Sequence, residues 1–155
     1  MHAPMHTQDA VHTLDMLIET CDIGVYGFRT AAEHAHSQQL RSLFSRRADE
    51  CALASAELLT KFVLLGGDPA SGGPSDRALL RGWATLLGML ASDSDQIMIE
   101  ACERGDDSAL QTYREALDRP LPDDLRQLIE DQFERVERNH AEARRLRDRV
   151  RALSS

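Results

Sequence analysis

Apolar residues recur at steps of three and four over four long stretches of this chain, and that spacing constrains the fold more than any other feature. In an α-helix, residues spaced in this way share one stripe, which must be buried against other helices. The four stretches predict main helices over residues 8–36, 38–66, 93–118 and 122–153. The sequence therefore predicts an all-α protein.

The connections between these helices predict how they are arranged. The first and second helices, and likewise the third and fourth, are joined by very short segments, which force antiparallel neighbours. About 25 residues separate the second helix from the third, enough to return along the length of a bundle. This segment contains a loop rich in glycine and proline and a predicted short crossover helix over residues 76–91. Two tight hairpins with one long crossover form a ferritin-like four-helix bundle.

Length and composition limit the class of protein. A chain of 155 residues with 42% hydrophobic and 28% charged residues is typical of one globular domain, here residues 1–155. The N-terminal residues lack the pattern of a signal peptide, and no apolar run approaches the roughly 20 residues of a membrane span. We therefore expect a cytoplasmic protein with no membrane partner.

The charge of the chain bears on its partners. The formal net charge of -8 argues against a broad nucleic-acid-binding surface, because attraction to phosphate needs clustered positive charge. Arginines do crowd residues 138–151, but acidic residues are interleaved with them, which is typical of a solvated helix face. A docking patch for another molecule is the alternative interpretation of this segment.

The nucleophilic residues of the sequence predict no enzyme class. Three cysteines, Cys21, Cys51 and Cys102, are widely spaced and odd in number, so we expect small core residues and no disulfide framework. No Ser/His/Asp or Cys/His arrangement and no phosphate-binding glycine loop stands out. The sequence therefore favours a protein that is not an enzyme.

One motif nevertheless points to metal chemistry. Glu137 and His140 form a Glu-x-x-His pair, which places a carboxylate and an imidazole on one helix face, as in di-metal carboxylate bundles. A shift of 87 residues superposes Glu19 on Asp106 (106 - 19) and Glu50 on Glu137 (137 - 50), which suggests a duplicated hairpin. The same shift places Leu53 where His140 stands (140 - 53), so the first hairpin lacks the imidazole.

Helix geometry favours a second interpretation. At about 100° per residue, Asp106, Asn139 and His140 point inward, whereas Glu19 and Glu50 lie on the outer sides of their helices. Arg47 also points inward. A buried polar network of these four inward residues, Arg47, Asp106, Asn139 and His140, therefore competes with the metal site.

Several runs of sequence resemble a known family. They include Leu-Ile-Glu-Thr-Cys-Asp (17–22), Gly-Phe-Arg-Thr-Ala-Ala-Glu (27–33), Arg-Ala-Asp-Glu-Cys-Ala (47–52), Arg-Gly-Trp (81–83), Glu-Arg-Gly-Asp-Asp (103–107), Tyr-Arg-Glu-Ala-Leu (113–117) and Val-Glu-Arg-Asn-His (136–140). Together they resemble a bacterial family of small ferritin-like four-helix-bundle proteins of unknown function. The resemblance implies the fold but no reaction, substrate or partner.

The second hairpin is also similar to rubrerythrin-type di-iron proteins. Their third helix carries two acids three residues apart, matched here by Glu103 and Asp106, before the Glu-x-x-His motif of the fourth. The resemblance implies iron or manganese ligands among Glu103, Asp106, Glu137 and His140, with Glu19 and Glu50 from the first hairpin. The first hairpin departs from the pattern at Leu53.

Two functional hypotheses result. The first is a non-catalytic, degenerate relative of di-iron proteins that forms a homodimer through Met16, Ile23 and Tyr26, an apolar stripe on the outer side of the first helix. The second is a di-metal protein that uses iron or manganese in metal handling or in the response to oxidative stress. We favour the first because the inward positions of the first hairpin carry no acid.

Overall fold

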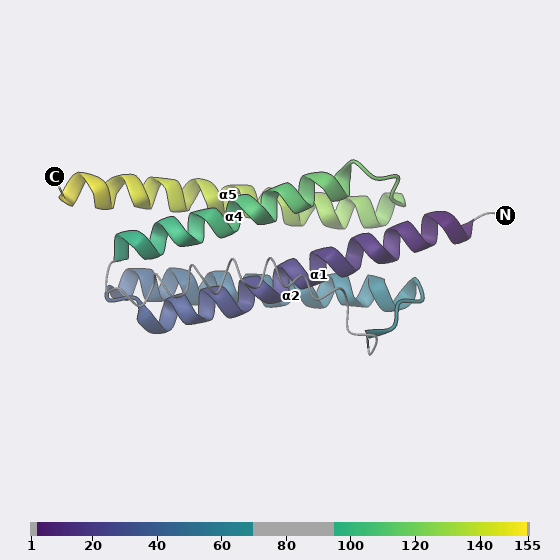
Figure 1. The fold of residues 1–155 in the computed structure, drawn as a ribbon, viewed down its shortest axis with the longest axis horizontal. Helices are drawn as coiled ribbons and strands as arrows, with labels where there is room; N and C mark the ends of the chain where they lie inside the picture. Colours follow the sequence, from purple (N-terminus) through teal and green to yellow (C-terminus); the bar gives the residue numbers. More distant parts are fainter. Residues whose placement is uncertain (1–2, 70–94, 155) are drawn as a thin grey trace.

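The computed structural model describes residues 3–69 and 95–154, and the regular structure of these residues is helical. The helices α1 (Ala3–His34), α2 (Gln38–Leu64), α4 (Asp95–Leu117) and α5 (Asp123–Ser154) lie side by side (Figure 1). The predicted all-α four-helix bundle is confirmed. The crossover helix expected over residues 76–91 lies outside the described residues, and no helix among those described is long and apolar enough to span a membrane.

The first hairpin consists of α1 and α2, joined by a turn of three residues. The Ser37 side chain caps α2, because its Oγ accepts a hydrogen bond from the backbone N–H of Leu40 at 3.0 Å. At the other end of α2, Gly66 has a φ of 95°, which residues with a side chain rarely adopt. The N–H of Gly67 then bonds to the carbonyl of Phe62 at 2.9 Å, so the two glycines end the helix.

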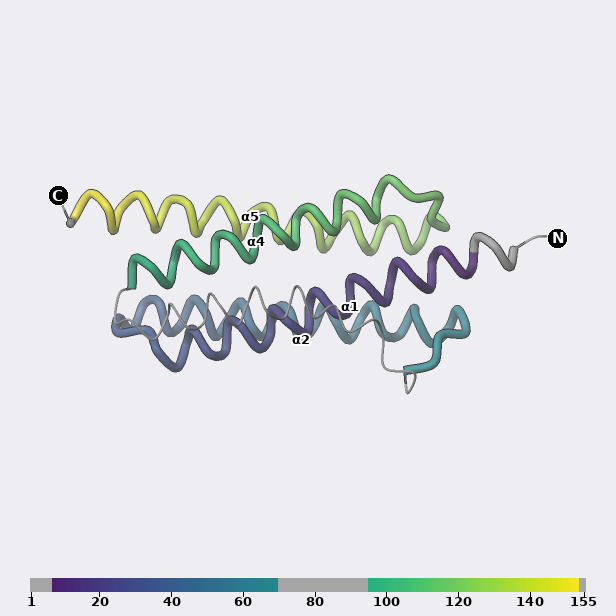
Figure 2. Tube along the Cα trace, in the orientation of Figure 1, coloured from purple at the N-terminus to yellow at the C-terminus, as the bar shows by residue number. Residues whose placement is uncertain are grey.

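The second hairpin consists of α4 and α5, and an arginine holds its turn together. The guanidinium of Arg126 donates to the carbonyl oxygens of Leu117, at 2.8 Å, and Arg119, at 2.6 Å. Leu121 in the same turn is buried. The turn is therefore fixed to both helices, and the tube along the Cα trace shows the two helices running antiparallel (Figure 2).

The two hairpins are joined so that α2 and α4 run in the same direction. The carboxylate of Asp95, at the start of α4, accepts hydrogen bonds from the backbone N–H groups of His36 and Ser37, at 3.1 and 3.3 Å. Because His36 and Ser37 immediately precede α2, both helices begin at the same end of the bundle, as Figure 1 also shows. The predicted long crossover requires this parallel direction.

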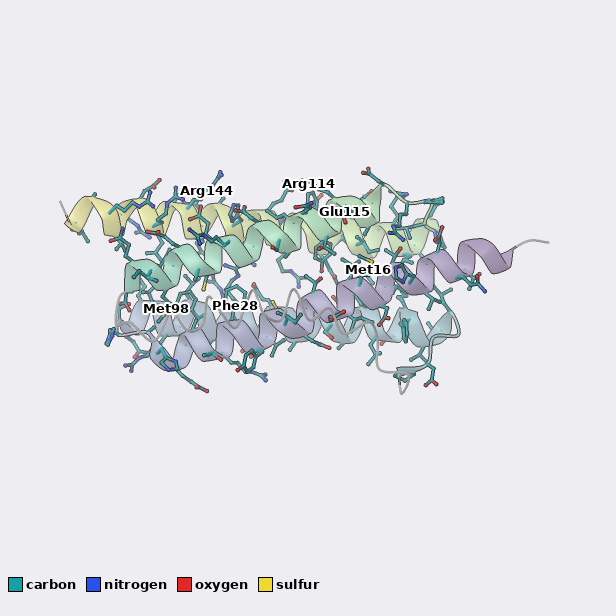
Figure 3. The ribbon with its side chains drawn as sticks, in the orientation of Figure 1. Met16, Phe28, Met98, Arg114, Glu115 and Arg144 are labelled. Atoms are coloured by element: carbon teal, nitrogen blue, oxygen red, sulfur yellow. The ribbon has the colours of Figure 1, made fainter. Side chains whose placement is uncertain are left out.

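The core has two apolar halves. One half includes Leu14 and Leu58, and the other includes Phe28 and Met98. Figure 3 labels Phe28 and Met98 of the second half and, nearer the N-terminus of α1, Met16. Charged side chains are buried between these halves, and those side chains form the candidate site.

Candidate functional site

The candidate site is centred on an ion pair between α2 and α4. Arg47 and Asp106 are 4% and 3% exposed, so both charges are almost completely removed from water. The guanidinium Nη2 of Arg47 donates to Oδ1 of Asp106. The same guanidinium lies over the ring of Phe28 in α1, 4.6 Å from the ring centroid. One arginine therefore connects three helices.

The spacing of apolar residues explains why Arg47 is buried. In α2 the buried residues Leu40, Phe44, Ala54 and Leu58 form the inward stripe, and Arg47 lies on that stripe, one turn after Phe44. A buried charge is costly unless it is paired. Asp106, which lies on the buried face of α4, supplies that pairing.

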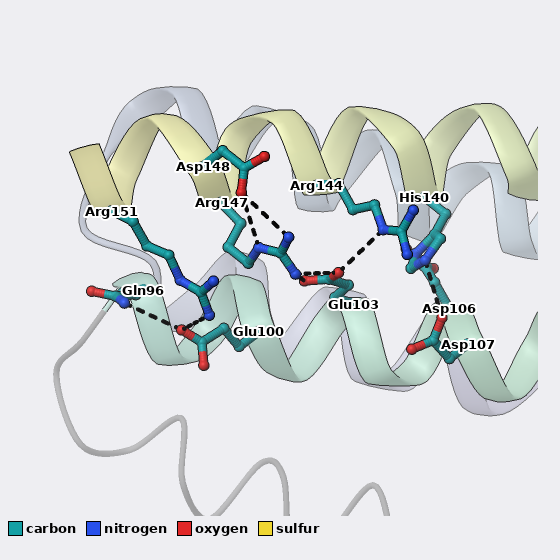
Figure 4. Close-up of polar contacts among 10 residues, drawn as sticks. All are labelled: Gln96, Glu100, Glu103, Asp106, Asp107, His140, Arg144, Arg147, Asp148 and Arg151. Atoms are coloured by element: carbon teal, nitrogen blue, oxygen red, sulfur yellow. Dashed lines mark hydrogen bonds and ion pairs between the residues drawn. The ribbon is translucent and has the colours of Figure 1, made fainter. Parts of the chain in front are cut away.

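His140 of α5 completes what we call the central cluster, Arg47, Asp106 and His140. Its Nε2 lies 3.0 Å from Oδ1 of the exposed Asp107, and its Nδ1 lies 3.7 Å from Oδ2 of Asp106 (Figure 4). At 3.7 Å the second contact is an ion-pair distance and too long for a hydrogen bond. Asp106 Oδ2 and His140 Nδ1 are thus buried without a hydrogen-bond partner among the described residues.

The protonation of His140 follows from this geometry. The Asp106 carboxylate raises the pKa of His140 above its ordinary value of 6.5, burial opposes the shift, and Asp107 adds to it. A neutral ring that donated from Nε2 to Asp107 would turn the lone pair of Nδ1 toward Asp106 Oδ2, which is repulsive. The doubly protonated ring presents an N–H to each carboxylate and is therefore the favoured form.

Further along α4 and α5, a ladder of ion pairs continues from the central cluster toward the C-terminus. Arg147 Nη1 donates to both carboxylate oxygens of the buried Glu103, at 2.7 and 2.6 Å, and Arg144 lies 3.6 Å from the same carboxylate. The last rung joins Glu100 to Arg151 at 3.4 Å (Figure 4). The Glu103 carboxylate is therefore already neutralised by arginine.

On the other side of the cluster, a chain of hydrogen bonds links α1, α4, α5 and α2. The hydroxyl of the buried Tyr113 donates to Oε1 of Gln132 at 2.8 Å, and Cys21 Sγ lies 3.5 Å from the same hydroxyl. Gln132 Nε2 donates to the carbonyl of Ala54 at 3.3 Å and to Glu57 at 3.1 Å. Sequence reasoning missed Gln132, although it lies three residues after the buried Ile129 on the inward face of α5.

A cavity of about 60 Å³ lies beside the Arg47–Asp106 pair, and all four described helices contribute to its wall. Small residues, among them Gly24, Gly105 and Ala109, leave this space open. Small-molecule sites have volumes of roughly 300 to 1,000 Å³. The cavity is therefore too small for a substrate of ordinary size.

The three cysteines are poor nucleophiles where the structure places them. Burial raises the pKa of Cys21 to about 11 and that of Cys51 to about 12. Burial also raises the pKa of Cys102, which is 2% exposed. Because the thiolate is the reactive form, these side chains are neutral thiols near pH 7.

The proposed metal ligands do not converge on one point. Glu103 and Asp106 are paired with arginines, while Glu137 is exposed to solvent. Glu50 accepts a hydrogen bond from Asn139 at 2.8 Å, and Glu19 is half-buried in α1. Among residues 3–69 and 95–154, no three or more His, Cys, Asp or Glu side chains are grouped so as to hold a metal ion. The ligand set that the resemblance implies therefore fits an iron or manganese pair poorly.

The structure brings together three of the four residues of the predicted polar network. Arg47, Asp106 and His140 form the central cluster, whereas Asn139 bonds to Glu50 between α5 and α2. Sequence reasoning also missed Asp107 and Arg147 as partners. Arg147 lies seven residues after His140, a spacing that places both on one face of a helix.

The apolar stripe predicted on the outer side of α1 is only partly exposed. Tyr26 is 58% exposed, Met16 is half-buried and Ile23 is only 8% exposed. Ile23 is thus part of the folded interior, contrary to the expectation that all three side chains face outward. The stripe offers Tyr26 and part of Met16 to another molecule.

A family model matches most of the chain. The family model described as "Domain of unknown function (DUF2383)" matches residues 9–119. The match includes α1, α2 and α4, and hence Arg47, Glu103 and Asp106, but ends before α5. No curated protein matches the chain.

Proposed function

This chain belongs to the DUF2383 family, and we propose that it is a non-catalytic, ferritin-like relative of the di-iron carboxylate proteins. In this proposal the central cluster replaces the metal centre and fixes the position of α4 against α2 and α5. The observation that carries the proposal is the buried ion pair of Arg47 with Asp106. The guanidinium supplies, from within the chain, the positive charge that a metal ion supplies in a di-iron protein.

The chemistry of the neighbouring residues supports a structural role for the cluster. Each buried acid of α4 has an arginine partner: Arg47 for Asp106 and Arg147 for Glu103. Both carboxylates therefore already have a guanidinium partner within the chain. The cysteines near the cavity are neutral thiols, so the cluster lacks an activated nucleophile among the described residues.

We further propose that the protein acts as a homodimer through the exposed part of the α1 stripe, Met16 and Tyr26. An exposed tyrosine is well suited to an interface because its ring is apolar and its hydroxyl remains hydrated. In sedimentation, Tyr26→Glu should convert the dimer to a monomer, whereas Arg29→Glu, on an exposed neighbouring position, should leave it a dimer. A wild-type protein that sediments as a monomer over the micromolar range would rule out this interface.

A di-metal protein that binds iron or manganese is the second candidate. The observation in its favour is the pair of buried atoms, Asp106 Oδ2 and His140 Nδ1, that face each other without a hydrogen bond. Buried polar atoms without partners are rare in folded proteins. A cation between them would satisfy both, although Glu137, the remaining member of the motif, is exposed.

Metal loading separates the two candidates. The purified protein is incubated without oxygen with ferrous iron or manganese and desalted, and then metal content and melting temperature are measured. We expect less than about 0.1 ion per chain and no rise in melting temperature, because a ligand that binds only the folded state would stabilise it. One or more ions per chain, lost in both Asp106→Asn and Glu137→Gln, would establish the di-metal candidate instead.

A further inference from the structure

A second hollow lies between α2 and α5, and its volume of about 300 Å³ far exceeds that of the cavity beside the central cluster. This volume is at the lower end of the range of small-molecule sites. The walls include Ser42, Leu43 and Arg46 from α2 and Glu142, Leu146 and Arg149 from α5. We call this hollow the arginine groove.

The lining of the arginine groove combines an apolar part with a charged part. Leu146 is 7% exposed and Leu43 is half-buried, and the two leucines provide the apolar part of the lining. Arg46 pairs with Glu142 across the groove at 2.5 Å, and both side chains are substantially exposed. A ligand in the groove would therefore meet leucine side chains and guanidinium groups together.

The charge of the groove is positive although the chain as a whole is strongly negative. Arg149 is exposed and forms no ion pair among the described residues. Two arginines, Arg46 and Arg149, thus line the groove with one acid, Glu142, on a protein with a formal net charge of -8. This local excess of positive charge favours an anion.

The existing ion pair would not exclude such an anion. An exposed pair such as Arg46–Glu142 contributes little to stability, roughly 0 to 1 kcal/mol, so its arginine can exchange partners at small cost. Guanidinium groups bind carboxylate and phosphate through paired hydrogen bonds. Arg46 and Arg149, on opposite walls, could therefore hold one such group between them.

We propose that the arginine groove binds a small amphipathic anion. Arg46 and Arg149 hold its carboxylate or phosphate, and its apolar body rests on Leu43 and Leu146. Glu142 competes with the ligand for Arg46. This site is separate from the central cluster and does not depend on the function proposed above.

Because Glu142 competes with the ligand for Arg46, substitutions of the acid and of the arginines should change the binding affinity in opposite directions. Glu142→Gln removes the competing charge and should tighten binding about threefold or more, whereas Arg149→Gln and Arg46→Gln should weaken it about fivefold or more. Arg138→Gln is the matched control, because Arg138 is an exposed arginine of α5 that does not line the groove. It should change affinity less than about twofold.

The experiment is isothermal titration calorimetry of the full chain at low ionic strength with octanoate and octyl phosphate. Octan-1-ol and octylamine test whether the ligand must carry a negative charge, and inorganic phosphate tests whether it needs an apolar body. We expect both amphipathic anions to bind at one site per chain, and the affinity to fall as sodium chloride is added. The neutral, cationic and inorganic probes should bind at least tenfold more weakly.

Several outcomes would overturn the proposal. One is equal binding of octan-1-ol and octanoate, and another is equal weakening by Arg138→Gln and Arg149→Gln, which would indicate general charge attraction. Inorganic phosphate that binds as tightly as octyl phosphate would exclude a role for the leucines. In the wild-type protein, methyl NMR signals of Leu43 and Leu146 that do not shift with octanoate would place any binding elsewhere.

Discussion

The two hairpins of this bundle are held together by different chemistry. In the first, α1 and α2 pack through small and apolar side chains, and Gly24 lies so close to Cys51 that an added Cβ would be 2.9 Å from its Sγ. In the second, acids of α4 meet basic side chains of α5 in a ladder. Packing depends on shape, whereas the ladder depends on charge and on how far each rung is from water.

The ladder itself runs from buried to exposed. The side chains of Asp106, Glu103 and Glu100 are 4%, 11% and 33% exposed. Because water screens an exposed pair, the same type of contact should contribute less toward the C-terminus of α5. The comparison therefore predicts that substitutions along the second hairpin lower the free energy of unfolding by amounts that decrease toward the C-terminus of α5. In the first hairpin it predicts a loss of stability when a packed side chain becomes larger.

The largest effect is expected at Asp106, at the buried end of this gradient, where the carboxylate also pairs with Arg47 of the first hairpin. Asp106→Ala leaves the Arg47 guanidinium buried without its partner and should lower the free energy of unfolding by about 3 to 5 kcal/mol, measured by urea denaturation. The double variant Arg47→Met/Asp106→Leu removes both charges and should recover most of the loss. A double variant as unstable as the single one would show that the unpaired charge is not the cause.

A smaller effect is expected from volume in the first hairpin. Gly24→Val places new atoms against Cys51 and should cost about 1 to 3 kcal/mol. Adding Cys51→Ala makes room and should recover part of this loss, and the effect of Gly24→Val should not change between low and high salt. Equal destabilisation with and without Cys51→Ala, in denaturant titrations, would contradict close packing at this contact.

The pH dependence of stability should report on His140. Its pKa is raised by Asp106, so the protonated form favours the folded state, and this contribution is fully present below about pH 6.5. It is lost as the pH rises through the higher pKa of the folded state. The wild type should thus be more stable than His140→Gln by about 1 kcal/mol at pH 5.5, with a smaller gap at pH 8.5, and a gap that widens with pH would contradict the assignment.

The smallest effect is expected at the exposed end. Glu100→Gln breaks the pair with Arg151 and should change the free energy of unfolding by less than about 0.5 kcal/mol, an effect that disappears in 1 M salt. Thermal denaturation at two salt concentrations checks this. A loss as large as that of Asp106→Ala would abolish the proposed gradient.

Much of the fold and part of the site could be predicted from the sequence. Periodicity placed the helices and pointed Arg47 and Asp106 inward, because a single helix fixes which residues share a face. The contacts between side chains of different helices could not be predicted in the same way, since they depend on the register between the helices. In the antiparallel helices α4 and α5, residues that face each other have a nearly constant sum of residue numbers, 250 for Glu103–Arg147 and 251 for Glu100–Arg151. The value of that sum depends on where the turn reverses the chain, which periodicity does not fix.

Glu50 shows a second limit of periodicity. Its angle from the apolar stripe of α2 predicted an outward side chain, yet it bonds to Asn139 of α5 and lines the central cavity. A helix in a bundle faces two neighbours, and the space between α2 and α5 is bridged by polar side chains that an apolar stripe does not reveal. The same limit explains why Gln132 was missed.

The hydrogen bonds from His36 and Ser37 to Asp95 give the bundle an internal reporter. These two amides belong to the first hairpin, but their partner belongs to the second. Hydrogen exchange at His36 and Ser37 should therefore accelerate whenever the hairpins separate, even while α1 and α2 remain folded against each other. Exchange at these positions would thus measure the association of the hairpins apart from the stability of either one.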